Sequence, residues 1–188
     1  GGAIYQKDTS ASQKAHIDGD ITGKFIGNQA ISQEKYGYGG AIFNSGTING
    51  NINADFADNY VESIFSLGGA IYNNGTIGQN TDTAITGDFT NNKVYATRKN
   101  EARGGVFYNT GKIFSSIQAK FTNNSAKSND KYAQGGAIYN SGTISIIKNS
   151  SFYNNSVEGK VGQESSTKGG AIYSTTDLNI KADDKQTS

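Results

Sequence analysis

The sequence predicts an all-β protein of the right-handed parallel β-helix (solenoid) class. Two short sequence blocks alternate along the chain, and the apolar residues comprise 20 Ile but only 2 Leu. Only 34% of the 188 residues are hydrophobic, and the chain contains 25 Gly and no Pro. β-Branched residues favour strands, and a chain without Pro keeps every backbone N–H available for pairing. A narrow core that takes a few apolar residues from each coil reconciles this composition with a folded protein.

The first block is a Gly-Gly pair followed by a small residue, and it occurs six times. Its copies begin at Gly1, Gly39, Gly68, Gly104, Gly135 and Gly169, with intervals of 29 to 38 residues. One repeat per coil therefore makes residues 1–188 a single β-helical domain. We expect the glycines at a bend that needs a positive φ or a close approach of neighbouring coils. No helix is expected after them, so a phosphate-binding role is not indicated.

The second block, Phe-x-x-Asn, occurs five times and alternates with the first. Its residues are Phe25 and Asn28, Phe56 and Asn59, Phe89 and Asn92, Phe121 and Asn124, and Phe152 and Asn155. We expect a structural role for both positions. The rings should stack inside the core, and each amide should bond to the amides above and below it.

Two further positions are occupied almost throughout by Ile. One contains Ile17, Ile48, Ile77, Ile113 and Ile144 and ends in Leu178, and the other contains Ile21, Ile52, Ile85 and Ile117, with Lys148 interrupting it in the fifth copy. If one repeat makes one coil, equivalent residues stack about 4.8 Å apart. Each repeat then contains three short apolar segments, which are too short for helices.

The segment between each Phe-x-x-Asn block and the next Gly-Gly pair varies in length and is rich in Lys, Glu, Ser and Asn. These segments run from Asn28 to Tyr38, Tyr60 to Leu67, Asn92 to Arg103, Asn124 to Gln134, and Asn155 to Lys168. We expect a surface loop in every repeat, and the loops together should form an extended face.

Alternation after the Gly-Gly pair places Ile on one face of a strand and an aromatic residue on the other. We expect the more apolar set inside the core: Ile4, Ile42, Ile71, Phe107, Ile138 and Ile172. The other set would then form an outward aromatic ridge available for binding: Tyr5, Phe43, Tyr72, Tyr108, Tyr139 and Tyr173. The alternative is that the neighbouring loops cover this ridge.

Catalytic and metal-binding patterns are weak in this sequence. It has no Cys and one His, His16, which alternation turns away from the core. The acidic pairs are Asp18 with Asp20, Asp55 with Asp58, Asp82 with Asp88, and Asp183 with Asp184. None of them recurs at a fixed repeat position, as the two facing carboxyls of a glycosidase or the converging oxygens of a cation site would require. We therefore expect no enzyme, no cofactor and no metal, and keep a β-helical polysaccharide-acting enzyme as an alternative.

The two alternating blocks resemble the repeats of chlamydial polymorphic membrane proteins and related autotransporter adhesins. The likeness is carried by Gly-Gly-Ala-Ile, as at Gly39 to Ile42 and Gly135 to Ile138, in alternation with Phe-x-x-Asn, as at Phe121 to Asn124. The resemblance implies a β-helical passenger exported through a C-terminal barrel, displayed at the outer membrane and acting in adhesion and virulence. It also implicates both tetrapeptides in binding.

The leading functional hypothesis is accordingly a bacterial cell-surface adhesin that attaches to host cells or other surfaces. Its partner would be a host-cell protein, a glycan or a second copy of the chain, and a self-assembling extracellular fibre is a further alternative. A net charge of +1 gives no electrostatic indication of nucleic-acid binding. We expect an internal piece of a longer protein, with membrane contact only through a barrel domain outside this chain.

Overall fold

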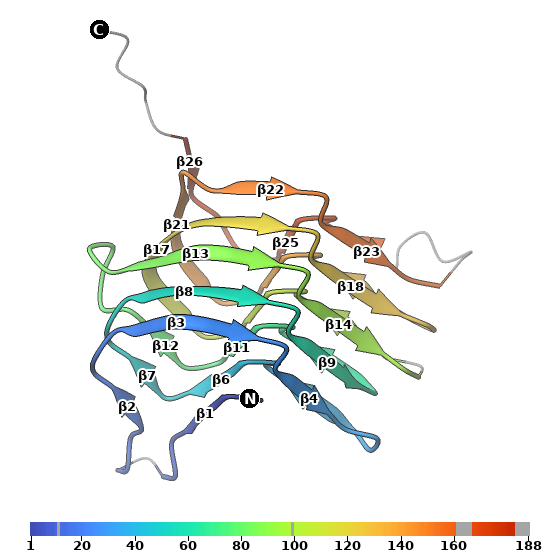
Figure 1. Ribbon diagram of the computed structural model, residues 1–188, viewed down its shortest axis with the longest axis horizontal. Coiled ribbons are helices and arrows are strands. Elements are labelled where there is room, and N and C mark those ends of the chain that lie inside the picture. The colour runs from blue at the N-terminus through green and yellow to red at the C-terminus, as the bar shows by residue number, and fades with distance from the viewer. Residues whose placement is uncertain (11, 99, 161–166, 183–188) are drawn as a thin grey trace, which may run out of the picture.

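The computed structural model describes residues 1–10, 12–98, 100–160 and 167–182, and none of these is helical. The described chain winds into a solenoid in which every strand pair is parallel (Figure 1). Four sheets run along the solenoid, and we call them A, B, C and D in chain order within a coil. Sheets C and D contain one strand from each coil and have five strands each, so the predicted parallel β-solenoid is confirmed with five coils.

The strands are short, as the breaks at Gly, Asn and Asp predict. Sheet A contains β1 (Ile4–Lys7), β6 (Ile42–Ser45), β11 (Ile71–Asn73), β16 (Phe107–Asn109), β20 (Ile138–Asn140) and β25 (Ile172–Ser174). Sheet B contains β2 (His16–Ile17), β3 (Ile21–Ile26), β7 (Thr47–Ile48), β8 (Ile52–Ala57), β12 (Thr76–Ile77), β13 (Ala84–Thr90), β17 (Lys112–Thr122), β21 (Thr143–Lys148), β22 (Ser151–Tyr153) and β26 (Ile180–Lys181). Sheet C contains β4 (Gln29–Ile31), β9 (Tyr60–Ser63), β14 (Lys93–Ala96), β18 (Ser125–Ser128) and β23 (Ser156–Glu158). Sheet D contains β5 (Tyr36–Tyr38), β10 (Phe65–Leu67), β15 (Ala102–Arg103), β19 (Ala133–Gln134) and β24 (Thr167–Lys168).

Sheets A and B enclose the main core, which we call the body. The five Phe rings of the Phe-x-x-Asn blocks stack in one file, with centroids 4.6 to 5.1 Å apart and planes within 11°. Ile42, Ile71, Phe107 and Ile138 pack beside this file and are fully buried. The predicted inward orientation of the Ile set and the predicted register of the Phe file are therefore both confirmed.

One predicted position in the body is wrong. Ile147, which is 1% exposed, pairs with Ile117 in place of Lys148. The register shifts by one residue after Ile113, and Asn149, whose φ is 51°, restores it before Phe152. The Ile column therefore continues through the fifth coil, because the register shift places Ile147 inside the core in place of Lys148.

The end of the chain shows a related adjustment. Leu178, expected to continue the first Ile column, lies outside the strands and packs partly buried against the body core. Ile180 instead pairs with Ile147 and extends the second Ile column into β26.

The segments expected to be surface loops are instead pairs of strands, and this prediction is wrong. In each coil a strand of sheet C runs outward and a strand of sheet D returns, which builds a projection that we call the flap (Figure 1). Its own core consists of Val61, Val94, Ala96, Ala102, Ala126 and Ala133. These small side chains let the two sheets pack closely face to face.

The two glycines of each pair have separate tasks, and the structure supports both predicted reasons for them. The first adopts a positive φ, for example 68° at Gly68 and 67° at Gly135. The second has no room for a Cβ, because a Cβ at Gly105 would clash with the carbonyl oxygen of Gly136 in the next coil. The pair therefore turns the chain into sheet A and brings neighbouring coils together.

The Asn residues of Phe-x-x-Asn form the predicted ladder. In the first four of these residues, the side-chain Nδ2 donates to the Oδ1 of the next Asn at 2.8 to 3.0 Å. From the second coil on, the Nδ2 also donates to the carbonyl oxygen of the preceding coil's Phe at 2.8 to 2.9 Å. A second ladder in sheet A, which the sequence analysis missed, joins Asn44, Asn73, Asn109 and Asn140 by bonds of 2.7 Å. Buried amides thereby satisfy one another along the solenoid.

Candidate functional site

The predicted aromatic ridge exists as a continuous stack on the outer face of sheet A. The rings of Tyr5, Phe43, Tyr72, Tyr108, Tyr139 and Tyr173 lie in one file, with neighbouring centroids 4.7 to 5.6 Å apart. Parallel pairing in register produces this file, because each ring occupies the position after the buried Ile or Phe of its strand. Its role in binding remains a prediction.

Much of this ridge is covered, as the alternative in the sequence analysis anticipated. Phe43, Tyr108 and Tyr139 are 6 to 9% exposed, whereas Tyr5 is 63% exposed. The cover comes from the last residue of each sheet D strand, the one that precedes the Gly-Gly pair. Tyr38 lies 4.6 Å from Tyr72, measured between ring centroids, and Leu67 packs with the same group of rings.

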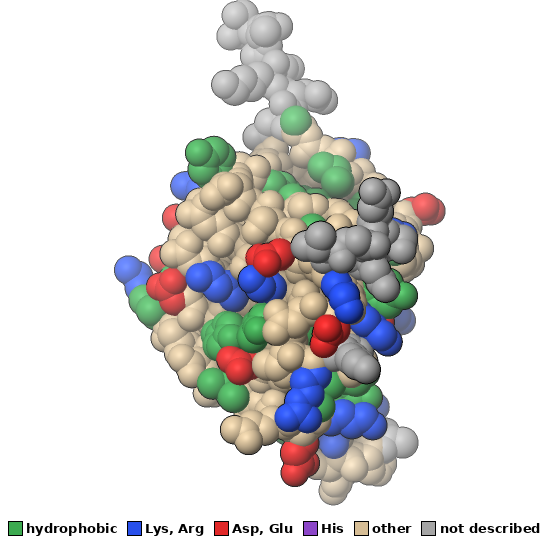
Figure 2. Space-filling model, turned by 90° about the vertical axis from the view of Figure 1, so that its right-hand side faces the viewer, with side chains coloured by type: hydrophobic (Ala, Val, Ile, Leu, Met, Phe, Trp, Pro, Cys, Tyr) green, Lys and Arg blue, Asp and Glu red, His purple; other side chains and the backbone are tan. Residues whose placement is uncertain are grey.

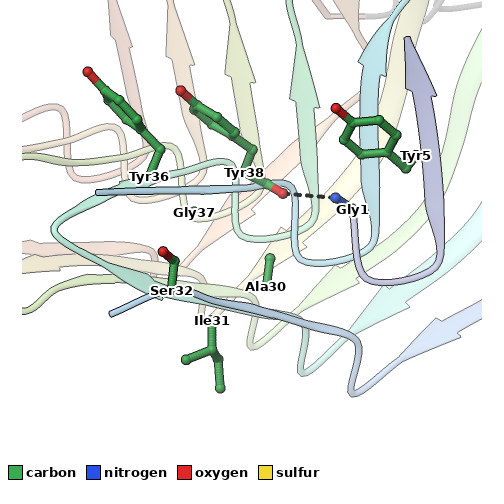
Figure 3. Close-up of a pocket in the computed structure, with 8 residues that line it drawn as sticks. All are labelled: Gly1, Tyr5, Ala30, Ile31, Ser32, Tyr36, Gly37 and Tyr38. Carbon is green, nitrogen blue, oxygen red and sulfur yellow. Dashed lines mark hydrogen bonds between the residues drawn. The ribbon is translucent and has the colours of Figure 1, made fainter. Parts of the chain in front are cut away.

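Sheet D adds aromatic residues of its own beside the ridge. Tyr36 stacks on Tyr38 with centroids 5.5 Å apart and on Phe65 with centroids 5.0 Å apart. Figure 3 shows Tyr36 and Tyr38 projecting from the same side of β5, next to Tyr5 of β1. Gly37 between them faces the other way, into the flap, where a Cβ would lie 2.7 Å from a methyl of Val61.

We call the strip where the outer faces of sheets A and D meet the aromatic seam. From sheet A it contains the six ridge residues, and from sheet D and the residues leading into it Tyr36, Tyr38, Phe65, Leu67, Glu101, Arg103, Tyr132 and Gln134. Its most exposed rings after Tyr5 are Tyr36 at 42% and Tyr132 at 37%. The seam is mainly aromatic, but it is not one open ridge.

The seam changes character in the third and fourth coils. There Arg103 and Gln134 occupy the positions that Tyr38 and Leu67 occupy earlier. The Arg103 guanidinium carbon lies 4.7 Å from the centre of the Tyr139 ring, and its Nη2 is 2.8 Å from Oε2 of Glu101. A polar cluster is thus built into an aromatic wall.

Two phenols of the seam, those of Tyr72 and Tyr108, have raised pKa values. Burial raises the pKa of Tyr72 to about 12, and a hydrogen bond with Thr110 opposes this shift. Burial also raises the pKa of Tyr108, while the nearby positive charge of Arg103 opposes the rise. These hydroxyls can therefore donate hydrogen bonds over the whole neutral pH range.

The Phe-x-x-Asn residues form no part of this seam. Their rings face the body core and their amides face one another, so the structure gives them the predicted structural role. The third position of the block was not recognised from the sequence. It contains Gly27, Asp58, Asn91, Asn123 and Asn154, all with φ between 52° and 66°. Gly, Asn and Asp are the residue types that tolerate a positive φ. Their recurrence at this position could have indicated the conformation from the sequence.

Three of the acidic residues considered for catalysis accept hydrogen bonds from the next coil. Asp18 accepts a bond from Asn49 at 2.6 Å, and Asp20 accepts from the backbone N–H of Asn51 at 2.8 Å. Asp55 accepts from the backbone N–H of Asp88 at 3.1 Å. The pair Asp183 and Asp184 lies outside the described residues. His16 is exposed on β2, as alternation predicts.

The flap presents a charged edge to the solvent. Figure 2 shows Lys and Arg side chains interspersed with Asp and Glu on this side of the molecule. The mixture agrees with the net charge of +1. Among the described residues, no cluster of three or more His, Asp or Glu could hold a metal ion. No helix in this same part of the chain is long and apolar enough to cross a membrane.

The sequence analysis missed the sheet D half of the seam. Tyr38, Leu67, Arg103 and Gln134 all stand one residue before a Gly-Gly pair, and Tyr36, Phe65, Glu101 and Tyr132 stand three residues before it. The constant spacing was therefore visible, but the mixed residue types at these positions concealed the column. Only the parallel pairing of sheet D reveals that they share a face.

Fold and seam together define a repeat protein of the parallel β-solenoid class with one aromatic-lined side. Residues 114–141 and 144–175 match the model of the Chlamydia polymorphic membrane protein (Chlamydia_PMP) repeat. Each matched stretch contains one Phe-x-x-Asn block and one Gly-Gly pair, so the chain carries this repeat and the suspected resemblance is confirmed there. The match indicates a surface-exposed passenger of the autotransporter type. Searches of curated proteins and of solved structures found no match.

Proposed function

We propose that this chain acts as an adhesin, attaching a bacterial surface to host cells or other surfaces through the aromatic seam. The observation that carries the proposal is the set of exposed rings along one strip of the solenoid, above all Tyr36 and Tyr132. Tyr side chains with one exposed polar end are typical anchors of binding surfaces. The match to a surface-protein repeat supports the same function.

A binding role is proposed in preference to a catalytic one. The acidic side chains Asp18, Asp20 and Asp55 accept hydrogen bonds from the next coil. Carboxylates engaged in this way have a structural use that accounts for their presence without a reaction.

Attachment of protein-coated beads to cultured epithelial cells tests the proposal. The double variant Tyr36→Ser, Tyr132→Ser removes two exposed rings from the seam and leaves both cores intact. We expect roughly tenfold weaker attachment, equivalent to about 1.4 kcal/mol. The matched control is Tyr153→Ser, because Tyr153 is 71% exposed but lies on β22, outside the seam. Equal attachment by the double variant and the wild type would refute the proposed role of the seam.

A further inference from the structure

We propose that a groove at the corner between sheets A and B binds an oligosaccharide that carries an anionic group. The groove lies outside the aromatic seam, so the inference goes beyond the proposed function and does not depend on it. It follows the turns after β11, β16 and β20 in three successive coils. Its lining contains the hydroxyls of Thr76, Thr110 and Thr143, the side chains of Asn74 and Lys112, and glycines of the same turns.

The polar side chains of the groove are open to solvent. Asn74, Thr110, Lys112 and Thr143 are exposed, and Thr76 is partly exposed. The glycines at the middle of each turn contribute no side chain that could fill the hollow. The volume of the groove is about 360 Å³. Small-ligand sites typically have about 300 to 1,000 Å³, so the hollow is large enough for a short oligosaccharide.

The second Asn ladder holds one wall of the groove in place. Thr76, Lys112 and Thr143 are register partners on neighbouring strands, so their side chains repeat once per coil, about 4.8 Å apart. The backbone carbonyl oxygens of these three residues accept hydrogen bonds of 3.1 to 3.4 Å from the buried ladder amides of Asn44, Asn73 and Asn109, respectively. The wall is therefore preformed, which lowers the ordering cost of binding.

The charge of the groove favours a ligand with an anionic group. Lys112 is the only charged residue among the described residues that line it. In the part of the chain that the structure describes, no carboxylate lies within ion-pair distance of its Nζ. An exposed ammonium without a compensating carboxylate attracts a carboxylate or a sulfate.

The remaining lining distinguishes a sugar from other anionic ligands. The hydroxyls of Thr76, Thr110 and Thr143 donate and accept hydrogen bonds, as sugar hydroxyls also do. An extended peptide would need pockets for its apolar side chains, but the described lining contains no hydrophobic residue. A nucleic acid would need several cations along its backbone, and here there is one. An acidic oligosaccharide therefore fits the groove best.

Isothermal titration of the full chain with purified saccharides tests the inference. The anionic probes are sialyllactose, sulfated lactose and a hyaluronan tetrasaccharide, and lactose is the neutral probe that shares its core with the first two. We expect at least one anionic probe to bind, and lactose to bind about tenfold more weakly. In Lys112→Gln, the affinity for the bound anionic probe should fall about tenfold, because the charged hydrogen bond is lost.

Two further variants sharpen this experiment. Lys120→Gln is the matched control, because Lys120 lies on the same strand β17, is exposed, and forms an ion pair with Asp88 outside the groove. It should bind like the wild type. Thr143→Val removes one hydroxyl and keeps the shape of the side chain, so the affinity should fall about threefold. All three changes are at the surface and should leave the fold intact.

The inference is wrong if lactose binds as tightly as the best anionic probe, if no probe binds up to millimolar concentration, or if Lys112→Gln binds like the wild type. Binding of a carboxylated or of a sulfated probe supports it and identifies the anionic group. The variant Tyr36→Ser, Tyr132→Ser should bind these sugars normally, because both rings lie outside the groove. Loss of cell attachment in that variant and loss of sugar binding in Lys112→Gln are therefore separate results.

Discussion

The body and the flap solve the same packing problem with side chains of opposite size. The body core contains stacked Phe and Ile, with Phe56, Phe89 and Phe121 fully buried. The flap core contains Val and Ala, and its buried Ser66 donates to the carbonyl oxygen of Tyr95 at 2.7 Å. Large side chains fill the wide space between sheets A and B, whereas small ones permit the close contact of sheets C and D. The body should therefore be sensitive to lost volume, and the flap to added volume.

Removing a ring from the body should have the largest effect. Phe121→Ala deletes a fully buried ring that stacks on Phe89 at 5.1 Å and on Phe152 at 4.6 Å, measured between centroids. We expect the free energy of unfolding to fall by about 3 to 5 kcal/mol, because the rings above and below cannot fill the cavity. Chemical denaturation followed by circular dichroism measures this loss.

Phe152→Ala is the matched control for that experiment. It removes the same side chain from the same column, where the ring is only partly buried and stacks on the single neighbour Phe121 among the described rings. The loss should be clearly smaller than at Phe121. Equal losses at the two positions would contradict the view that burial within the file determines stability.

Adding volume to the flap should have the next largest effect. Ala126 on β18 is fully buried in register with Val94 and Val157, so Ala126→Leu forces three further carbon atoms between sheets C and D. We expect a destabilisation of about 1 to 3 kcal/mol from overpacking. Amide hydrogen exchange should show the change in sheets C and D, with the body strands largely unaffected.

The neighbouring residue provides the control for the flap. Lys127→Leu introduces the same side chain on the opposite, exposed face of β18 and removes a surface ion pair with Glu158. Such pairs contribute about 0 to 1 kcal/mol, so the change should be small. If Ala126→Leu were tolerated as well as Lys127→Leu, the flap would not be closely packed.

The same contrast in size explains which parts of the fold could be predicted from the sequence. The body was predicted almost completely, because each coil contains one Phe equivalent to Phe121 and one Gly-Gly pair. These residue types are distinctive enough to be recognised as a repeat in the sequence. The flap was mistaken for loops, because Ala126, Ala133 and Ser128 are common in loops and carry no distinctive pattern. Lys148 was misplaced because a register shift cannot be read from spacing alone. The site was half predicted, since the ridge has a uniform residue type and sheet D does not.

A substitution of Tyr72 in the aromatic seam, which joins the body and the flap, should have the smallest effect on stability. This effect should be visible only at alkaline pH. Burial raises the pKa of Tyr72 from 10 to about 12, so between these values the unfolded chain loses a proton that the folded chain retains. Stability from this group is complete below pH 10 and falls as the pH rises towards 12. In Tyr72→Phe the melting temperature should therefore decline less steeply over this interval than in the wild type. Thr110→Val removes the hydrogen-bond partner of Tyr72 but keeps its phenol, so it should retain the wild-type decline. A decline of equal slope in Tyr72→Phe would mean that this ring is not shielded where sheet D meets sheet A.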